Sequence, residues 1–162
     1  MEKFPDLVAK HPEAELLIVG DGPHREDLEK LASELNVSDS VTFTGEVPWE
    51  QVGKYYQLGD VFISTSTTET QGLTFIEGMA ANVPVVAKYD KNLEELISDG
   101  VNGRLFHEDE KIPAILYEIL TEEEKAASLA EQAFEDVQEM SAKKFAQQVE
   151  TVYKNAINKA GK

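Results

Sequence analysis

Residues 61–87, VFISTSTTETQGLTFIEGMAANVPVVA, contain an apolar, β-rich run, then a segment of helical period, then a second apolar run. Short apolar runs of this kind predict buried strands, and Leu73–Ala81 fits a helix between them. Strand, helix and strand in this order form a βαβ unit with parallel strands. Two carboxylates, Glu69 and Glu77, stand on either side of Gly72 at the junction of the first strand with the helix. Their presence there needs an explanation.

The same alternation extends in both directions along the chain and predicts an α/β fold with a parallel sheet. The predicted strands are Leu16–Val19, Val41–Thr44, Val61–Thr65, Pro84–Ala87 and Arg104–Phe106. The predicted helices are one that opens at Pro23 and stops at Asn36, then Trp49–Leu58, Leu73–Ala81 and Leu93–Asp99, the last closed by Gly100. Residues 1–120 therefore form the α/β unit, and residues 121–162 are expected to be a helical extension packed on the same domain.

Two closing helices are expected in residues 121–162. Thr121 with Glu124 predicts a good N-terminal cap, and Ser141 a weaker one. The last helix carries one apolar stripe, formed by Phe145, Val149, Val152, Tyr153 and Ile157. Such a stripe either packs on the core or binds a partner, and the pattern favours packing on the core.

Composition excludes several classes of protein. A length of 162 residues with 41% hydrophobic residues suits one globular domain. The net charge of -16 opposes binding to nucleic acid or to an anionic lipid surface. The chain has no cysteine, which excludes disulfides and thiolate sites. No apolar run approaches the roughly 20 residues of a membrane span, and the charged start is unlike a signal peptide.

The loop VGDGPHRE, residues 19–26, places Gly20 and Gly22 between a strand and a helix. This spacing suggests a dinucleotide fingerprint, but Arg25 occupies the place of the third glycine and Asp21 would oppose a pyrophosphate. A tight turn that borders a ligand cleft is the favoured interpretation. Aromatic residues of the following region, Trp49, Tyr55 and Tyr56, stand at helical spacing, which favours a place in the core over a stacking platform.

Glu77 has two interpretations. At about 100° per residue it lies at the margin of the buried stripe of its helix, where a carboxylate needs partners. TFIE is a capping-box pattern, with Thr74 as N-cap and Glu77 returning to its amide. Alternatively, Gly72 precedes a helix whose free amides would receive a phosphate, and Glu77 one turn deeper could accept hydrogen bonds from ribose hydroxyls. Glu69 could do the same for a hexose.

Six motifs in order, LLIVGDGP, VTFTGEVP, YYQLGDVFISTS, ETQGLTFIEGMA, PVVAK and DGVNGRLF, resemble retaining glycosyltransferases that are built from two Rossmann-like domains and carry an E-x7-E motif. The resemblance covers nearly all of residues 7–120, the donor-nucleotide domain. STSTTETQGLTFIE is most similar to bacterial enzymes that glucosylate diacylglycerol from UDP-glucose. The resemblance implies a Rossmann-like parallel sheet with helices on both faces, followed by C-terminal helices.

The resemblance also implies roles for residues. Glu77 would bind the ribose hydroxyls and Glu69 the donor sugar, as the catalytic carboxylate. The amides of Gly72, Leu73 and Thr74 would meet the sugar and diphosphate, and the turn from Gly45 to Val47 would border the base. The protein's role in the family mechanism is mainly to position the donor and to stabilise charge on the departing diphosphate. No metal or other cofactor is expected, because His11, His24 and His107 are scattered and no D-x-D triplet occurs.

The chain departs from the family pattern in two ways. Asn82 replaces the usual glycine at the end of the motif helix, which asparagine tolerates as a left-handed cap. The family's first strand, with a loop carrying an arginine and a lysine, has no counterpart here. Its omission predicts five parallel strands with a gap between Leu16–Val19 and Val61–Thr65, closed by direct pairing or by another chain.

The function expected from the resemblance is the donor-binding half of a hexosyltransferase that transfers a sugar with retention, from UDP-glucose to an acceptor such as a lipid. The N-terminal acceptor-binding domain is absent from this chain, so the isolated chain is expected to be inactive. The alternative is a non-catalytic nucleotide-sugar-binding or protein-interaction module. The expected location is the cytoplasm, at the inner face of the membrane in the full enzyme, with only indirect membrane contact through a lipid acceptor.

Overall fold

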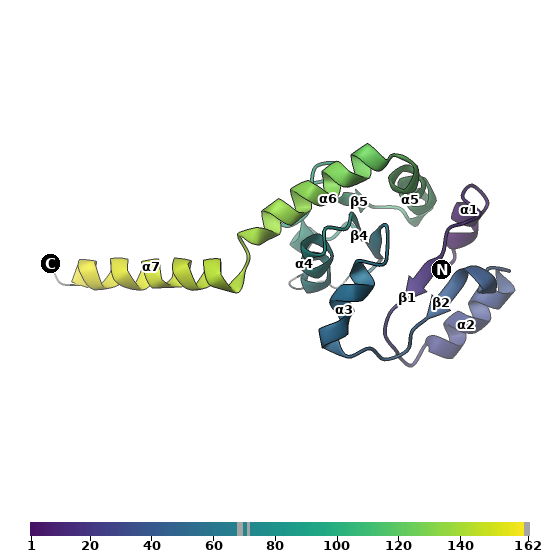
Figure 1. Cartoon of the computed structure of the whole chain (residues 1–162), viewed down its shortest axis with the longest axis horizontal. Coiled ribbons are helices and arrows are strands. Elements are labelled where there is room, and N and C mark those ends of the chain that lie inside the picture. Colours follow the sequence, from purple (N-terminus) through teal and green to yellow (C-terminus); the bar gives the residue numbers. More distant parts are fainter. Residues whose placement is uncertain (68–69, 71, 161–162) are drawn as a thin grey trace.

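The structure is a computed structural model that describes residues 1–67, 70 and 72–160 (Figure 1). Short strands alternate with helices, followed by three helices at the C-terminus. The strands are β1 Leu16–Ile18, β2 Val41–Phe43, β3 Phe62–Ser64, β4 Val85–Lys88 and β5 Arg104–Phe106. The α-helices are α1 Phe4–Val8, α2 Arg25–Glu34, α3 Trp49–Tyr56, α4 Leu73–Ala80, α5 Ile112–Thr121, α6 Glu123–Gln138 and α7 Ala142–Ala160. The five strands predicted from apolar runs are confirmed.

The described strands form two parallel sheets, one of β1 and β2 and one in the order β3-β4-β5. Leu16 is in register with Val41, and Phe62 is in register with Val85. The interruption lies between β1 and β3, as the sequence predicts, but these two strands do not pair with each other in the described residues. Of the two expected ways to close the gap, direct pairing is therefore wrong, and closure by another chain stays a prediction. The two sheets are held together instead by a shared core, to which residues of α1, α2 and α5 contribute.

Strand β4 shows how helices cover both faces. Its residues Val85, Val86 and Ala87 are fully buried. Val86 belongs to a core cluster with residues of α1, α2 and α5, whereas Val85 and Ala87 belong to a second cluster with residues of α4 and α6. Because successive side chains of a strand point to opposite faces, β4 is the middle of an α/β sandwich. The predicted fold class, a parallel sheet with helices on both faces, is confirmed.

The helix predicted at Leu93–Asp99 is wrong. The chain forms a 3-10 helix at Lys91–Leu93 and then turns. Leu93 and Ile97 are buried at the spacing of a helix, but the side chain of Asn102 interrupts the ladder. Its Oδ1 accepts from the amide of Ser98 at 2.7 Å, and its Nδ2 donates to the carbonyl of Leu96 at 3.1 Å. Side-chain bonds of this kind compete with helical ones.

The C-terminal helices differ from expectation at one cap. Thr121 is the last residue of α5, where its hydroxyl donates to the carbonyl of Tyr117 at 2.7 Å, so it does not cap α6. The weak cap of the next helix is confirmed, because Oγ of Ser141 accepts from the amide of Lys144 at 3.4 Å. Left-handed Asn36 and Asn82 have φ of 57° and 60°, which also agrees with the sequence.

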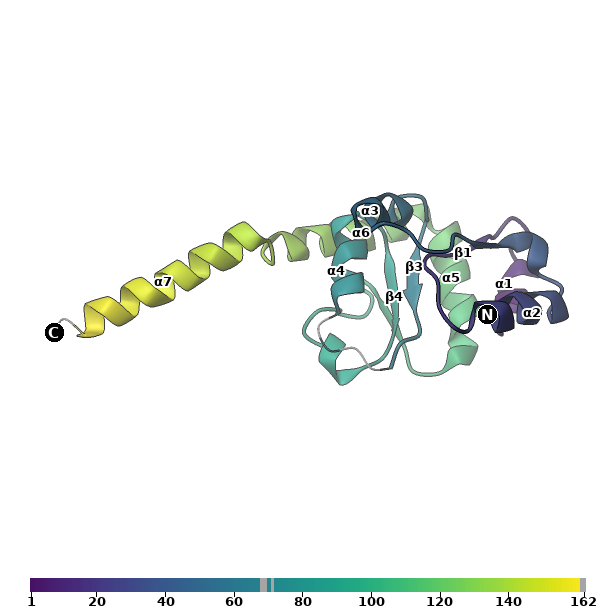
Figure 2. The same ribbon diagram turned by 90° about the horizontal axis from the view of Figure 1, so that it is seen from below.

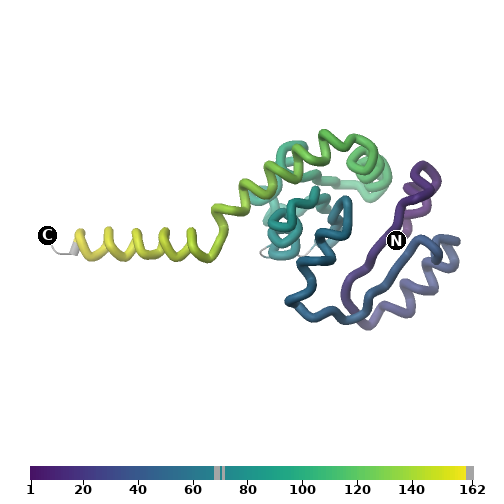
Figure 3. The backbone as a smooth tube through the Cα atoms, in the orientation of Figure 1, coloured from purple at the N-terminus to yellow at the C-terminus, as the bar shows by residue number. Residues whose placement is uncertain are grey.

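Helix α6 packs against α4 and α5 and buries four side chains, Leu129, Ala130, Ala133 and Val137. Helix α7 instead extends away from the other elements (Figures 1 and 3). Its apolar stripe is exposed, with Val152 and Ile157 at 67% and 70%. The expected packing of this stripe on the core of the chain is therefore wrong. Among the described residues, no helix combines the length and hydropathy that a membrane span requires.

Candidate functional site

The junction between β3 and α4 ends in a left-handed Gly72, with φ of 64°. A Cβ atom at this position would lie 2.9 Å from Cδ2 of Leu96 and 3.1 Å from Cδ2 of Leu93. Glycine is required here for two reasons. Its φ is positive, and its backbone lies against two leucine side chains. The entry of the chain into α4 is therefore fixed by a buried residue.

Gly72 is the N-cap of α4, and the first intrahelical bonds run from the amides of Phe75 and Ile76 to the carbonyl of Gly72, both at 3.0 Å. The amides of Gly72, Leu73 and Thr74 precede these donors, so they belong to the set that a helix leaves without an intrahelical partner. Leu73 and Thr74 are exposed. Such a helix start favours an anion through its amides and its positive dipole end.

Glu77 lies one turn into α4 with an exposed side chain. Its Oε2 accepts a hydrogen bond from the hydroxyl of Tyr56 at 3.0 Å. The capping-box alternative does not describe this helix, because α4 begins at Leu73 and Thr74 lies inside it, with Gly72 as the N-cap. The carboxylate of Glu77 therefore stands beside the start of α4 and is held by a neighbouring helix instead of by its own first turn.

The loops after β1 and β2 meet at two glycines. The amide of Gly20 donates to the carbonyl of Gly45 at 3.2 Å and also lies 3.2 Å from Oγ1 of Thr44. Arg25 covers this turn, since a Cβ at Gly45 would lie 3.0 Å from its Nη1. Val47 is half-buried just beyond. The loop with Gly20 and Gly22 is thus a tight turn packed on the Gly45 turn, as the sequence predicts.

Glu69, the predicted ligand of the donor sugar, lies outside the described residues. Of the other predicted site residues, Gly72, Leu73, Thr74 and Glu77 are brought together at the start of α4. Gly45 and Val47 belong to the separate turn after β2. Within the described part of the chain, no three His, Asp or Glu side chains are grouped as metal ligands.

The sequence did not reveal the role of Tyr56, and it placed Trp49, at the other end of α3, wrongly in the core. Trp49, Tyr55 and Tyr56 were expected in the core, but Trp49 is 80% exposed, Tyr55 is half-buried, and Tyr56 is half-buried with its hydroxyl on Glu77. Burial, assisted by the Glu77 carboxylate, raises the pKa of Tyr56 well above its ordinary value. Tyr56 is therefore a hydrogen-bond donor at any physiological pH. In the sequence, the only indication of this role was a tyrosine placed two residues before the motif LGDVF.

Two further side chains follow the ends of β4 and β5. Tyr89 and His107 stack with their ring centroids 4.4 Å apart, and Tyr89 also donates to Glu94. Lys88, at the end of β4, pairs with Asp109 at 2.9 Å. These residues occupy the carboxyl ends of parallel strands, where ligands of open α/β sheets bind. In the sequence, Lys88 and Tyr89 could have been found as the polar residues that directly follow the apolar run PVVA.

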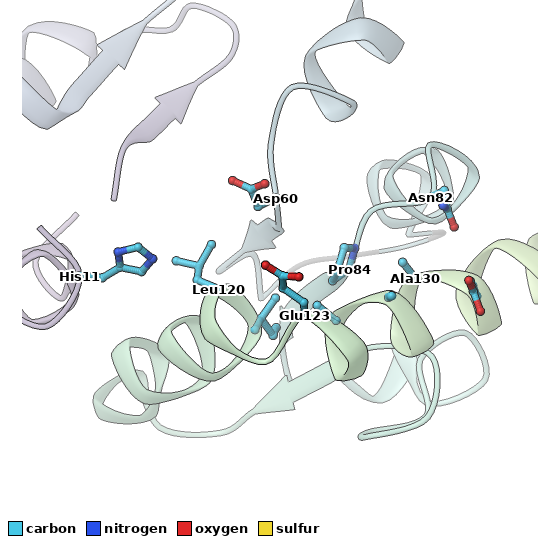
Figure 4. Close-up of a pocket in the computed structure, with 11 residues that line it drawn as sticks. His11, Asp60, Asn82, Pro84, Leu120, Glu123 and Ala130 are labelled. Carbon is cyan, nitrogen blue, oxygen red and sulfur yellow. The ribbon is translucent and has the colours of Figure 1, made fainter. Parts of the chain in front are cut away.

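A cavity lies elsewhere in the described residues. It has a volume of about 470 Å³ and opens between His11, Asp60, Glu123 and the start of α6 (Figure 4). Asp60 and Pro84, which also line it, precede β3 and β4. The cavity is therefore at the amino ends of these strands, opposite the start of α4. We assign the candidate site by its amides and carboxylate and not by this cavity.

Comparisons with known proteins identify the family of this chain. Residues 1–136 match the family model for Glycosyl transferases group 1. The chain is 34% identical over 162 residues to an alpha-monoglucosyldiacylglycerol synthase of Acholeplasma laidlawii, covering 100% of this chain and 41% of that protein. It is 36% identical over 156 residues to the enzyme of the same name from Streptococcus pneumoniae, covering 95% of this chain and 34% of that protein. The chain thus spans less than half the length of these relatives.

A solved structure of similar fold is that of HepE from Anabaena, in complex with UDP and glucose. It superposes with a TM-score of 0.83 at 24% identity, covering 96% of this chain and 44% of that one. The likeness supports the fold, with its parallel sheet, covering helices and C-terminal helices. With the family match over most of its length, the chain belongs to the glycosyl transferases of group 1.

Proposed function

We propose that this chain is the donor-nucleotide-binding half of a hexosyltransferase that moves a sugar from a nucleotide-sugar to an acceptor with retention. UDP-glucose is the proposed donor and a lipid the proposed acceptor. The names of the relatives from Acholeplasma laidlawii and Streptococcus pneumoniae support a glucosyl group and a diacylglycerol acceptor. The observation that carries the proposal is the exposed carboxylate of Glu77 beside the amide-rich start of α4.

Each group has a role that follows from its chemistry. The first-turn amides of α4, from Gly72 to Thr74, accept the negative charge of the diphosphate. Glu77 accepts hydrogen bonds from the ribose hydroxyls, and the Gly45–Val47 turn borders the base. Glu69 is proposed to bind hydroxyls of the donor sugar and to support the departing charge electrostatically, without acting as a nucleophile.

The charges of the described residues indicate that the diphosphate needs additional positive charge from outside these residues. Arg25 is paired with Glu29 at 2.8 Å and lies 3.5 Å from Asp21, and Lys88 is paired with Asp109. Arg25, which follows β1, and Lys88, at the end of β4, are thus already paired with carboxylates. We therefore propose that transfer requires cations from outside these residues, such as the arginine and lysine of the family's first loop, together with an acceptor-binding half. The reaction is placed in the cytoplasm, at the inner face of the membrane when the acceptor is a lipid.

Donor selection tests the proposal. Calorimetric titration of this chain with UDP-glucose, UDP and GDP-mannose should give binding of the two uridine compounds and weaker binding of the guanosine compound. Absence of heat with UDP-glucose and UDP would contradict it. The alternative, a binding module without transfer, is separated by mixing the chain with an acceptor-binding half and measuring glucosyl transfer to diacylglycerol. Turnover supports the enzyme, and donor binding without turnover supports the module.

A further inference from the structure

Tyr56 is the last residue of α3, and its hydroxyl reaches across to Oε2 of Glu77 on α4. The two residues are 21 positions apart and meet because α3 packs beside α4 (Figures 1 and 2). The 3.0 Å bond has a neutral donor and a carboxylate acceptor. A bond to a charged acceptor is stronger than one between neutral groups. It fixes one oxygen of the carboxylate on which the proposed function depends.

The ring of Tyr56 is held by a row of aromatic side chains that ends in the core. It meets Phe62 edge-on with ring centroids 5.1 Å apart, and Phe62 meets Phe75 in the same manner at 5.5 Å. Phe75 is fully buried in the first turn of α4. Edge-to-face pairs at these distances are favourable beyond the area that they bury. The position of the hydroxyl is therefore set by packing.

Gly78 keeps this row close to α4. A Cβ at Gly78 would lie 3.2 Å from Cδ1 of Phe62 and 3.2 Å from Cγ1 of Val85. The ring of Phe62 therefore lies directly against the helix backbone, one residue after Glu77. Since the interior tolerates little displacement, Phe62 and with it Tyr56 cannot move away from Glu77 without opening a gap.

The carboxylate has capacity left for a ligand. Among the described residues, no hydrogen bond reaches Oε1 of Glu77, and Oε2 uses one of its lone pairs on Tyr56. A vicinal diol presents two hydroxyl donors on neighbouring carbons, and a carboxylate with a fixed plane can accept both. Without Tyr56, the exposed side chain of Glu77 would have to lose rotamer freedom when the diol binds.

We propose that Tyr56 is a positioning residue that holds Glu77 ready for a ribose 2′,3′-diol and so makes the site selective for ribonucleotides over deoxyribonucleotides. The inference rests on the proposed function, in which Glu77 already binds the ribose hydroxyls, and adds to it the residue that holds this carboxylate in position. Tyr56 need not touch the ligand. It acts through the carboxylate.

The test is a titration of UDP and of 2′,3′-dideoxy-UDP against the chain, Tyr56→Phe and Tyr55→Phe. The Tyr56→Phe variant keeps the ring on Phe62 and removes only the hydroxyl. We expect its affinity for UDP to fall about 3- to 10-fold, as for the loss of one hydrogen bond, with the affinity for the dideoxy compound unchanged. Tyr55→Phe should bind both compounds as the unmodified chain does.

A double-mutant cycle adds a second readout that a purely structural role would not move. In a Glu77→Ala background, Tyr56→Phe should have no further effect on UDP affinity. Equal weakening of UDP and the dideoxy compound by Tyr56→Phe, or no weakening of either, overturns the role of Tyr56 while leaving donor binding intact. Absence of UDP binding by the unmodified chain overturns the proposed function and this inference together.

Discussion

Asn102 donates through its Nδ2 to Oδ2 of Asp136 at 2.7 Å and thereby connects the loop before β5 to helix α6. Asn102 is buried, at 5% exposure, and also bonds to the backbone of Leu96 and Ser98. A single buried side-chain amide thus makes three hydrogen bonds, to the backbone of Leu96 and Ser98 and to Asp136. The same loop supplies Leu96, which packs on Gly72, so this contact connects α6 to the candidate site.

Replacing Asn102 by alanine should lower the free energy of unfolding by about 2–4 kcal/mol, because three hydrogen bonds of a buried side chain are lost together. Urea denaturation monitored by circular dichroism measures the change. Asn155→Ala, at an exposed position of α7, is the matched control and should cause no loss. Similar stabilities for the two variants would show that the Asn102 bonds are not important for the fold.

Gly72→Ala should destabilise the protein by about 1–3 kcal/mol, because alanine is strained at positive φ and its Cβ would overlap Leu96. Gly53→Ala is the control, since a Cβ at Gly53 in α3 meets open space. Alanine in that helix should be neutral or slightly stabilising. Thermal unfolding of both variants checks the prediction, which fails if the two substitutions have the same effect.

Glu118 makes the free energy of unfolding depend on pH in the acidic range. Its hydrogen bond with Lys125, and then the charge of Arg104 at 2.5 Å, lower the pKa of Glu118 below its ordinary value of 4.5. The folded carboxyl therefore binds its proton at a lower pH than the unfolded one, so between the two pKa values the unfolded state binds more protons. The stabilisation from this residue is complete above the unfolded pKa and is lost as the pH falls through the folded pKa.

Urea unfolding between about pH 6 and pH 3 should accordingly show a steeper loss of stability for the natural chain than for Glu118→Gln. Glu135→Gln, at an exposed position of α6, serves as the control and should keep the natural slope. If Glu118→Gln and the natural chain lose stability in parallel, the ion pairs of Glu118 do not contribute to folding.

Deleting residues 142–162 should change the free energy of unfolding of the remaining chain by less than about 1 kcal/mol, because an exposed helix contributes little without tertiary contacts. Far-ultraviolet circular dichroism should register the lost helix. Deletion of residues 123–162 is the comparison, since it also removes Leu129, Ala133 and Val137 from the core and should unfold the chain. A large loss of stability on the shorter deletion would indicate that α7 packs on this chain in solution.

The strands and the left-handed residues were predictable because their signals are local. Val85 and Val86 form an apolar run that needs burial on both sides, and Gly72, Asn36 and Asn82 are residue types that tolerate positive φ. The location of the interruption between β1 and β3 followed from the expected strand order. Whether those strands would pair did not follow, because it depends on how the helices pack beneath them.

The features that could not be predicted from the sequence depend on contacts between residues that are distant along the chain. The bond from Tyr56 to Glu77 requires that α3 and α4 lie side by side, which no spacing within either helix reveals. Leu93 and Ile97 have helical spacing, but Asn102 takes over the backbone bonds that a longer helix would need. The stripe of α7 shows which face is apolar and does not show what covers it. Capping at Thr74 failed because Gly72 starts the helix earlier.

The most direct test of the account is the affinity for UDP-glucose of the unmodified chain and of Glu77→Ala, measured by titration calorimetry. Glu135→Ala is the control for loss of an exposed helical carboxylate. Loss of a charged hydrogen-bond acceptor predicts that Glu77→Ala binds about 10- to 100-fold more weakly, with Glu135→Ala unchanged. Equal affinities for the natural chain and Glu77→Ala would contradict the assignment of this carboxylate to the donor.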